Sequence, residues 1–199
     1  MKLGISGAHG TGKSTLLSAL KKEPFFKDFF FVEEVARRLI KETGSLKDAD
    51  SNRLVSFQRR VLRRQVEEEN KSPRFVSDRT VIDVLSYYEW YILYGKIQKT
   101  QTETWSTMIR FIEDRFESSP YDIVFYLPIE FDLEADGVRW TDRESQRTYD
   151  SILRGWLNYY SDHYKFFTVS GSLEQRVEQV LNYVLDFCDQ KGKGKNGQL

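Results

Sequence analysis

The chain has 199 residues, which is long enough for one α/β domain with a buried core but too short for two generous ones. Its 30 basic and 30 acidic residues balance, so the overall charge does not favour a nucleic-acid or membrane partner, and either would need a local patch. Cys188 is the single cysteine, which excludes disulfide frameworks and cysteine zinc sites and indicates a reducing, cytoplasmic location.

The chain opens with an apolar run, Lys2 to Ser6, that predicts a buried strand directly after Met1, so we expect no signal peptide. No apolar run approaches the roughly 18 residues that a membrane span needs. A helix with apolar residues at helical spacing begins near Thr15. The residues between strand and helix match the phosphate-loop pattern G-x-x-x-x-G-K-[ST] without a mismatch: Gly7, Ala8, His9, Gly10, Thr11, Gly12, Lys13 and Ser14.

A loop of this kind binds phosphates with its backbone. Its glycines let the chain wrap closely around a polyphosphate, with successive amides and the helix N-terminus directed at the negative charge. We expect Lys13 to reach the β and γ phosphates, Ser14 to offer its hydroxyl to Mg²⁺, and Thr15 to lie near the β and α phosphates. Strand, loop and helix occur in the order that a nucleotide site requires.

A second buried strand, Phe29 to Val32, leads directly into Glu33 and Glu34 and a helix that ends at Gly44. Ligands of open parallel sheets bind beyond the carboxyl ends of the strands, so either acid could face a phosphate acceptor. Glu34 and Arg37 share one helix face, where the acid would accept a hydroxyl proton and the arginine would bind an anionic group. Position alone equally allows a glutamate favoured by the helix dipole and a surface ion pair.

The next helix, Asn52 to Asn70, has one apolar face and several arginines, which are more typical of a solvated surface, although one or two could rim an acidic substrate pocket. A third strand, Arg74 to Ser77, then delivers Asp78 and Arg79 at its carboxyl end. We favour Asp78 as a residue that orients Mg²⁺ or as the base, rather than as a helix cap. Arg79 could clamp an acceptor phosphate, and Asp83, about one helical turn further on, is a second candidate for acceptor binding.

The second half of the chain adds a helix, Glu103 to Glu117, and a fourth strand, Tyr121 to Leu127. The segment 134–147 has little apolar periodicity and carries three arginines at a spacing of four, on one side of a helical turn: Arg139, Arg143 and Arg147. Phosphoryl transfer spreads negative charge over the γ-phosphate, so we expect these arginines to close over it from a lid. An ordinary surface with ion pairs to nearby acids is the alternative.

The chain ends with an aromatic-rich helix, Ile152 to Tyr164, a fifth strand, Lys165 to Val169, and an amphipathic helix, Leu173 to Cys188. The small residues 170–172 suit a loop that passes under a purine ring. Residues 190–199 carry Lys-Gly repeats and are expected to be disordered. We therefore expect a single domain over residues 1–189 with a lid at about 134–147.

Taken together, these motifs resemble those of P-loop kinases of the nucleoside and nucleotide class, most closely the group that contains the nicotinamide ribonucleoside kinase domain and its AAA-type ATPase relatives. The resemblance spans nearly the whole chain and rests on the phosphate loop and three further motifs: Glu34-Val35-Ala36-Arg37, Asp78-Arg79-Thr80 with Asp83, and Asp136-Gly137-Val138-Arg139. It implies a three-layer α/β/α P-loop fold with a five-stranded parallel sheet in the order 2-3-1-4-5 and a small helical lid. It also implies site residues of three kinds: Lys13, Ser14 and Asp78 for phosphate and magnesium, Glu34 and Arg37 for the acceptor, and Arg139 and Arg143 for the lid.

The sequence therefore predicts an ATP- and Mg²⁺-dependent kinase for a small nucleoside or nucleotide, with GTP as an alternative donor. One other hypothesis is a nucleotide-binding switch or adaptor with slow or no transfer. Another is a kinase that acts on nucleic acid, which the arginine-rich helix supports and the balanced charge disfavours. The identity of the acceptor, the choice of base among Glu33, Glu34 and Asp78, and the choice between monomer and homodimer stay open.

Overall fold

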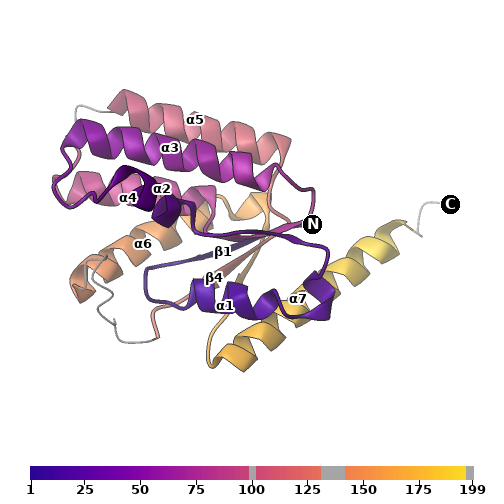
Figure 1. The fold of residues 1–199 in the computed structure, drawn as a ribbon. Coiled ribbons are helices and arrows are strands. Elements are labelled where there is room, and N and C mark those ends of the chain that lie inside the picture. Colours follow the sequence, from indigo (N-terminus) through magenta and orange to yellow (C-terminus); the bar gives the residue numbers. More distant parts are fainter. Residues whose placement is uncertain (99–101, 131–141, 196–199) are drawn as a thin grey trace.

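The computed structural model describes residues 1–98, 102–130 and 142–195, and in this part of the chain five parallel strands form one sheet (Figure 1). The strand order is β2-β3-β1-β4-β5, which confirms the predicted order. The strands are β1 (Lys2–Gly7), β2 (Phe30–Val32), β3 (Phe75–Asp78), β4 (Ile123–Leu127) and β5 (Lys165–Thr168). β1 is the central strand, and its carboxyl end leads into the phosphate loop. This end lies between the carboxyl ends of β3 and β4, because the register pairs Ile5 with Asp78 and Gly7 with Leu127.

Helices in the described residues cover both faces of the sheet (Figure 1). They are α1 (Lys13–Leu20), α2 (Val35–Thr43), α3 (Ser51–Glu69), α4 (Val81–Leu93), α5 (Thr102–Ser118), α6 (Arg143–Tyr159) and α7 (Leu173–Lys195). α1 and α7 pack on one face and α2 to α6 on the other, which confirms the predicted three-layer α/β/α fold. Over the described ranges, no helix combines the length and apolarity needed to cross a bilayer.

The strands contribute side chains alternately to two hydrophobic cores. Ile5 of β1 packs with Leu16 of α1 and Val180 of α7 on one face. On the other face, Phe75 of β3 packs in the cluster that contains Val81 at the start of α4. Because both faces are covered, each strand needs apolar residues on both sides, which is why the strands read as continuous apolar runs.

One predicted helix has different ends in the structure. The aromatic-rich helix expected over Ile152 to Tyr164 is α6, which begins earlier, at Arg143, and ends at Tyr159. It begins there because the Asp142 carboxylate accepts hydrogen bonds from the amides of Glu144 (3.2 Å) and Ser145 (3.0 Å), which caps the helix N-terminus. Part of the segment assigned to a lid is therefore the first turn of this helix.

The last helix continues past the boundary expected at residue 190. α7 runs to Lys195, and the Nζ of Lys191 donates to Asp122 at 2.6 Å and lies over the ring of Phe187. These contacts join the helix to the loop before β4, a long-range stabilisation that local composition does not indicate. The helix thus extends past the residue at which disorder was expected to begin. Residues 131–141, which include Arg139, and 196–199 lie outside the described residues.

Candidate active site

The glycine-rich loop between β1 and α1 has the backbone geometry of an anion site. Gly10 and Gly12 have φ angles of 78° and 85°, in the left-handed region that favours glycine. Gly12 is the N-cap of α1, and within the described structure no side chain caps this helix N-terminus. The first amides of α1 are thus directed at the open end of the loop, where Ser14 and Thr15 are exposed.

The Lys13 side chain lies inside the loop. It is 5% exposed, and its Nζ donates to the carbonyl of Ala8 at 2.6 Å. Burial, and secondarily the nearby Arg79 guanidinium, lowers the pKa of Lys13 to about 7. A polyphosphate bound in the loop would supply the negative charge that this ammonium group faces.

Ser14 and Asp78 meet at the carboxyl ends of β1 and β3. The Ser14 hydroxyl donates to Asp78 Oδ2 at 2.5 Å, while the buried Oδ1 accepts no hydrogen bond from any described residue. Burial raises the pKa of this carboxyl, which is 1% exposed. A hydroxyl and a carboxylate beside a phosphate site fit Mg²⁺, which takes few protein ligands and completes its shell with phosphates and water. The described residues contain no cluster of three or more His, Cys, Asp or Glu that could hold a metal ion.

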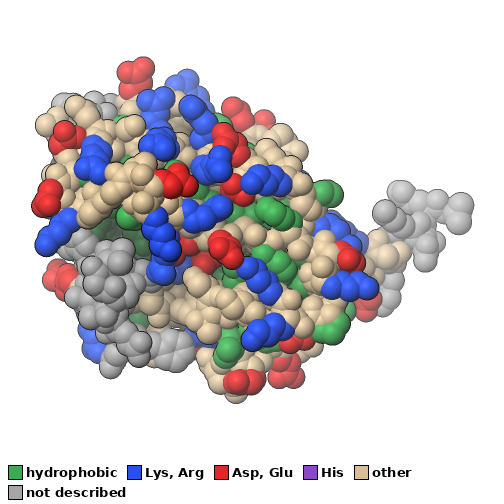
Figure 2. All heavy atoms as spheres, viewed as in Figure 1, with side chains coloured by type: hydrophobic (Ala, Val, Ile, Leu, Met, Phe, Trp, Pro, Cys, Tyr) green, Lys and Arg blue, Asp and Glu red, His purple; other side chains and the backbone are tan. Residues whose placement is uncertain are grey.

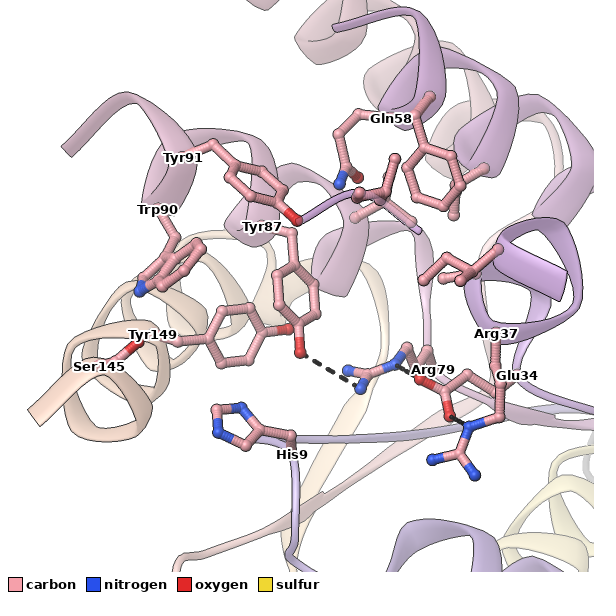
Figure 3. Close-up of a pocket in the computed structure, with 16 residues that line it drawn as sticks. His9, Glu34, Arg37, Gln58, Arg79, Tyr87, Trp90, Tyr91, Ser145 and Tyr149 are labelled. Atoms are coloured by element: carbon pink, nitrogen blue, oxygen red, sulfur yellow. Dashed lines mark hydrogen bonds and ion pairs between the residues drawn. The ribbon is translucent and has the colours of Figure 1, made fainter. Parts of the chain in front are cut away.

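Arg79 follows Asp78 and adopts a strained backbone conformation. Its φ is 84°, the only positive φ of a non-glycine residue among those described. The buried guanidinium forms an ion pair with Glu34 at 3.2 Å and donates to the hydroxyl of Tyr87 at 3.4 Å (Figure 3). It also pairs with Asp83 at 3.2 Å. Burial lowers the pKa of Arg79, but Tyr87 and Glu34, followed by Tyr149 and Asp83, together hold it well above its usual range, so the guanidinium remains a fixed cation beside the loop.

The structure separates the two adjacent glutamates after β2. Glu34 points into the site, where it pairs with Arg79 and, at 3.3 Å, with Arg37 (Figure 3). Glu33 points away, is 63% exposed, and pairs with Lys21 at 2.8 Å, which lowers the pKa of Glu33. Of the two acids that the sequence could not distinguish, only Glu34 lines the cavity described next.

A cavity of about 140 Å³ opens beside the phosphate loop (Figure 3). His9 of the loop, Glu34 and Arg79 line it together with residues of α2, α3, α4 and α6. Its walls are mainly aromatic and aliphatic, with polar groups placed among them; these residues include Phe57, Gln58, Tyr87, Trp90, Tyr91 and Tyr149. The rings of Tyr87 and Tyr149 pack with centroids 4.1 Å apart. Such a cavity suits a flat ring with a polar edge.

A family model described as an AAA domain matches residues 2–176. This chain belongs to that AAA domain family. Among curated proteins, none matches its sequence. Two solved structures share the fold of the AAA domain. Deoxyadenosine kinase from M. mycoides, with dCMP and dCDP bound, has a TM-score of 0.68 and 17% identity, covering 94% of this chain and 99% of the other. NadR in complex with NR has a TM-score of 0.69 and 20% identity, covering 93% of this chain and 50% of the other.

These similarities show that the AAA domain has the fold of P-loop nucleoside kinases, as the motifs predicted. Its structure brings most of the predicted site residues to one end of the sheet. Asp83 is fully buried there, and its carboxylate accepts from Ser6 (2.6 Å), from the amide of Thr80 (2.9 Å) and from Arg79 (3.2 Å). Arg143 and Arg147 are exposed on the first turns of α6.

Two residues that the sequence analysis missed support the loop of the AAA domain from distant helices. Arg176 of α7 donates to the carbonyl of Thr11 at 2.6 Å, across a separation of 165 residues. Gln146 of α6 donates to the carbonyl of His9 at 2.6 Å. Both side chains are about 2% exposed. No local pattern identifies them, because each looks like an ordinary polar residue on an amphipathic helix.

Proposed function

We propose that the chain is an ATP- and Mg²⁺-dependent kinase that phosphorylates a hydroxyl of a small nucleoside or nucleotide. The observation that carries the proposal is a single cavity lined by His9 of the phosphate loop, by the Glu34–Arg79 ion pair and by aromatic rings. A donor phosphate held by the loop and a ring-bearing acceptor in the cavity would thus meet at the ion pair. Positioning and charge stabilisation supply most of the catalysis in phosphoryl transfer.

On the donor side, the amides of the loop and Lys13 would bind the β and γ phosphates. Ser14 and Asp78 would hold Mg²⁺, which would neutralise the charge of these phosphates when bound. Arg79 is a fixed cation that can stabilise the transferring phosphoryl group. Arg143, together with Arg139, is proposed to add positive charge from the lid side.

On the acceptor side, Glu34 would accept the proton of the attacking hydroxyl as the new oxygen–phosphorus bond forms and the bond to the β-phosphate oxygen breaks, releasing ADP. Arg37 would bind an anionic group of the acceptor. Gln58, whose amide lines the cavity, would face the polar edge of the ring. Asp83 acts indirectly, as a positioning residue that holds Arg79.

The basic surface of α3 does not favour a nucleic-acid acceptor. Figure 2 shows basic side chains with acidic ones among them on the viewed face. Arg64 pairs with Glu67 at 3.5 Å and with Glu68 at 3.2 Å, and Glu68 also pairs with Arg38 at 3.9 Å. Acids thus neutralise Arg64, and together with the balanced net charge of the chain this favours a small acceptor over a nucleic-acid strand.

Transfer of labelled phosphate from ATP with Mg²⁺ to a panel of nucleosides and nucleotides tests the proposal. We expect the wild type to phosphorylate at least one member, and Lys13→Ala to lose essentially all transfer. Glu34→Gln should lower kcat by about 100-fold or more while ATP still binds, because a general base contributes that much. Glu33→Gln, the matched control, should keep full activity.

Full activity in Lys13→Ala or in Glu34→Gln would contradict these roles. If the wild type binds ATP tightly but phosphorylates no acceptor, the kinase proposal fails and a nucleotide-binding switch replaces it.

A further inference from the structure

The cavity contains a buried hydroxyl to which the proposed chemistry assigns no role. Ser145 lies in the first turn of α6, is 1% exposed, and lines the same cavity as Glu34 and Tyr149 (Figure 3). Its Oγ makes no hydrogen bond with any residue that the structure describes. Because buried polar groups nearly always have a partner, a hydroxyl in this position indicates a polar atom of a bound ligand.

Three other polar side chains of the cavity, those of Tyr149, Tyr87 and Glu34, are already engaged by the protein. The Tyr149 hydroxyl donates to the backbone carbonyl of Asp83 at 3.3 Å, and the Tyr87 hydroxyl accepts from Arg79 at 3.4 Å. Glu34 is held by its ion pairs. Ser145 therefore differs from them in offering both a donor and an acceptor to whatever enters the cavity.

The position of this hydroxyl is fixed from both sides. The Asp142 carboxylate accepts from the Ser145 amide at 3.0 Å, and the neighbouring Gln146 donates to the His9 carbonyl at 2.6 Å. The turn that carries Ser145 is thus attached to the phosphate loop. A preorganised hydroxyl binds its ligand at little entropic cost.

We propose that Ser145 is a specificity-determining residue that hydrogen-bonds a sugar hydroxyl of the acceptor, other than the one that is phosphorylated. The inference rests on the proposed kinase function. The reacting hydroxyl belongs at Glu34, and the ring belongs among the aromatic side chains with Gln58. Ser145, next to the residue that contacts the phosphate loop, lies on the α6 wall beside Tyr149 and Trp90, where a sugar attached to a ring among these aromatic side chains could reach it (Figure 3). A serine hydroxyl and a sugar hydroxyl can each donate and accept, so they are matched partners.

A thermodynamic cycle tests this contact. It removes the serine hydroxyl from the protein and a sugar hydroxyl from the ligand, separately and together. The acceptors are three nucleosides with the same base: the ribonucleoside, its 2′-deoxy form and its 3′-deoxy form. The proteins are the wild type, Ser145→Ala and the control Ser151→Ala, whose exposed serine on the same helix donates to the Arg147 carbonyl. Calorimetry gives Kd for each pair, and transfer assays give KM and kcat separately.

We expect the wild type to bind one deoxy form about fivefold more weakly than the ribonucleoside, the loss typical of one hydrogen bond. Ser145→Ala should abolish that preference, with the change in Kd and KM rather than in kcat, and Ser151→Ala should retain it. Thermal unfolding of Ser145→Ala should occur at the wild-type temperature or above, because an unsatisfied buried hydroxyl has been removed.

The inference is overturned if Ser145→Ala weakens the binding of all three nucleosides equally or leaves the wild-type preference intact. This holds even if the protein transfers phosphate normally. Absence of transfer by the wild type defeats the kinase function instead. The nucleoside Kd values then still decide whether Ser145 recognises the sugar. If none of the three nucleosides binds, the inference about Ser145 fails, whereas the kinase proposal fails only when no nucleoside or nucleotide of the panel is phosphorylated.

Discussion

Lys13 has an environment that links nucleotide binding to pH. Its ammonium group is buried among loop carbonyls, and its pKa falls to about 7 because burial disfavours the charge and Arg79 lies nearby. A bound triphosphate adds negative charge and raises that pKa again. Since the pKa is lower in the free protein than in the complex, binding takes up a proton above about pH 7.

We therefore expect the affinity for ATP to fall as the pH rises from about 7.5 to about 9, by up to about tenfold per pH unit. Calorimetry in buffers of different ionisation enthalpy measures the proton uptake directly. Lys13→Arg keeps the positive charge at all these pH values and should lose most of the dependence. An affinity of the wild type that does not vary over this range would argue against the assignment.

At the scale of elements, a buried ion pair joins α3 to α5 beneath the site. Glu69 of α3 pairs with Arg115 of α5 at 3.1 Å and accepts from the hydroxyl of Tyr121 at 2.7 Å. Burial raises the pKa of Glu69. Gln65, one turn earlier, donates both to Glu69 (2.9 Å) and to the carbonyl of the strained Arg79 (3.2 Å). The network thus connects the helical layer to the carboxyl end of β3.

Replacing Glu69 by Ala leaves the Arg115 guanidinium buried without its anionic partner. We expect this change to lower the free energy of unfolding by about 3–5 kcal/mol. Glu67→Ala on the same helix removes a half-exposed pair with Arg64 and should cost at most about 1 kcal/mol. Urea unfolding of the wild type and the two variants measures both changes in the free energy of unfolding. A small and equal loss of stability in the two variants would contradict the prediction.

At the scale of the whole molecule, the C-terminal layer supports the N-terminal loop. α1 and α7 lie together on one face of the sheet (Figure 1), and Arg176 of α7 reaches the carbonyl of Thr11. The same guanidinium donates to the carbonyl of Gly171 at 2.9 Å and pairs with Glu130 at 2.5 Å. The loop after β5 is thereby attached to the phosphate loop, although the two are distant in the chain.

We expect Arg176→Ala to raise the Kd for ATP with Mg²⁺ about tenfold, because a charge-assisted hydrogen bond that shapes the loop is lost. Calorimetry well below the unfolding temperature separates this effect from a loss of stability. Arg154→Ala, at an exposed position of α6, is the matched control and should leave the Kd unchanged. Equal Kd values for all three proteins would show that Arg176 has no influence on the loop.

The sequence by itself determined the phosphate loop, the five strands and the acids that end them. These features depend on short stretches: glycine spacing specifies the loop backbone, and apolar runs specify strands buried on both faces. Strand ends then identify Glu34 and Asp78 as candidates, because parallel strands carry ligands at their carboxyl ends.

Only the tertiary structure decided which side chains share the cavity. It separates Glu33 from Glu34 and engages Asp83 as a support for Arg79. It also brings Ser145 into the cavity and Arg176 to a loop far away in the chain. Helical periodicity shows that a helix has a buried face but not which residues of other elements meet it. Those contacts form only when the layers of the fold pack together. A close-packed interior then allows few alternative arrangements of the side chains.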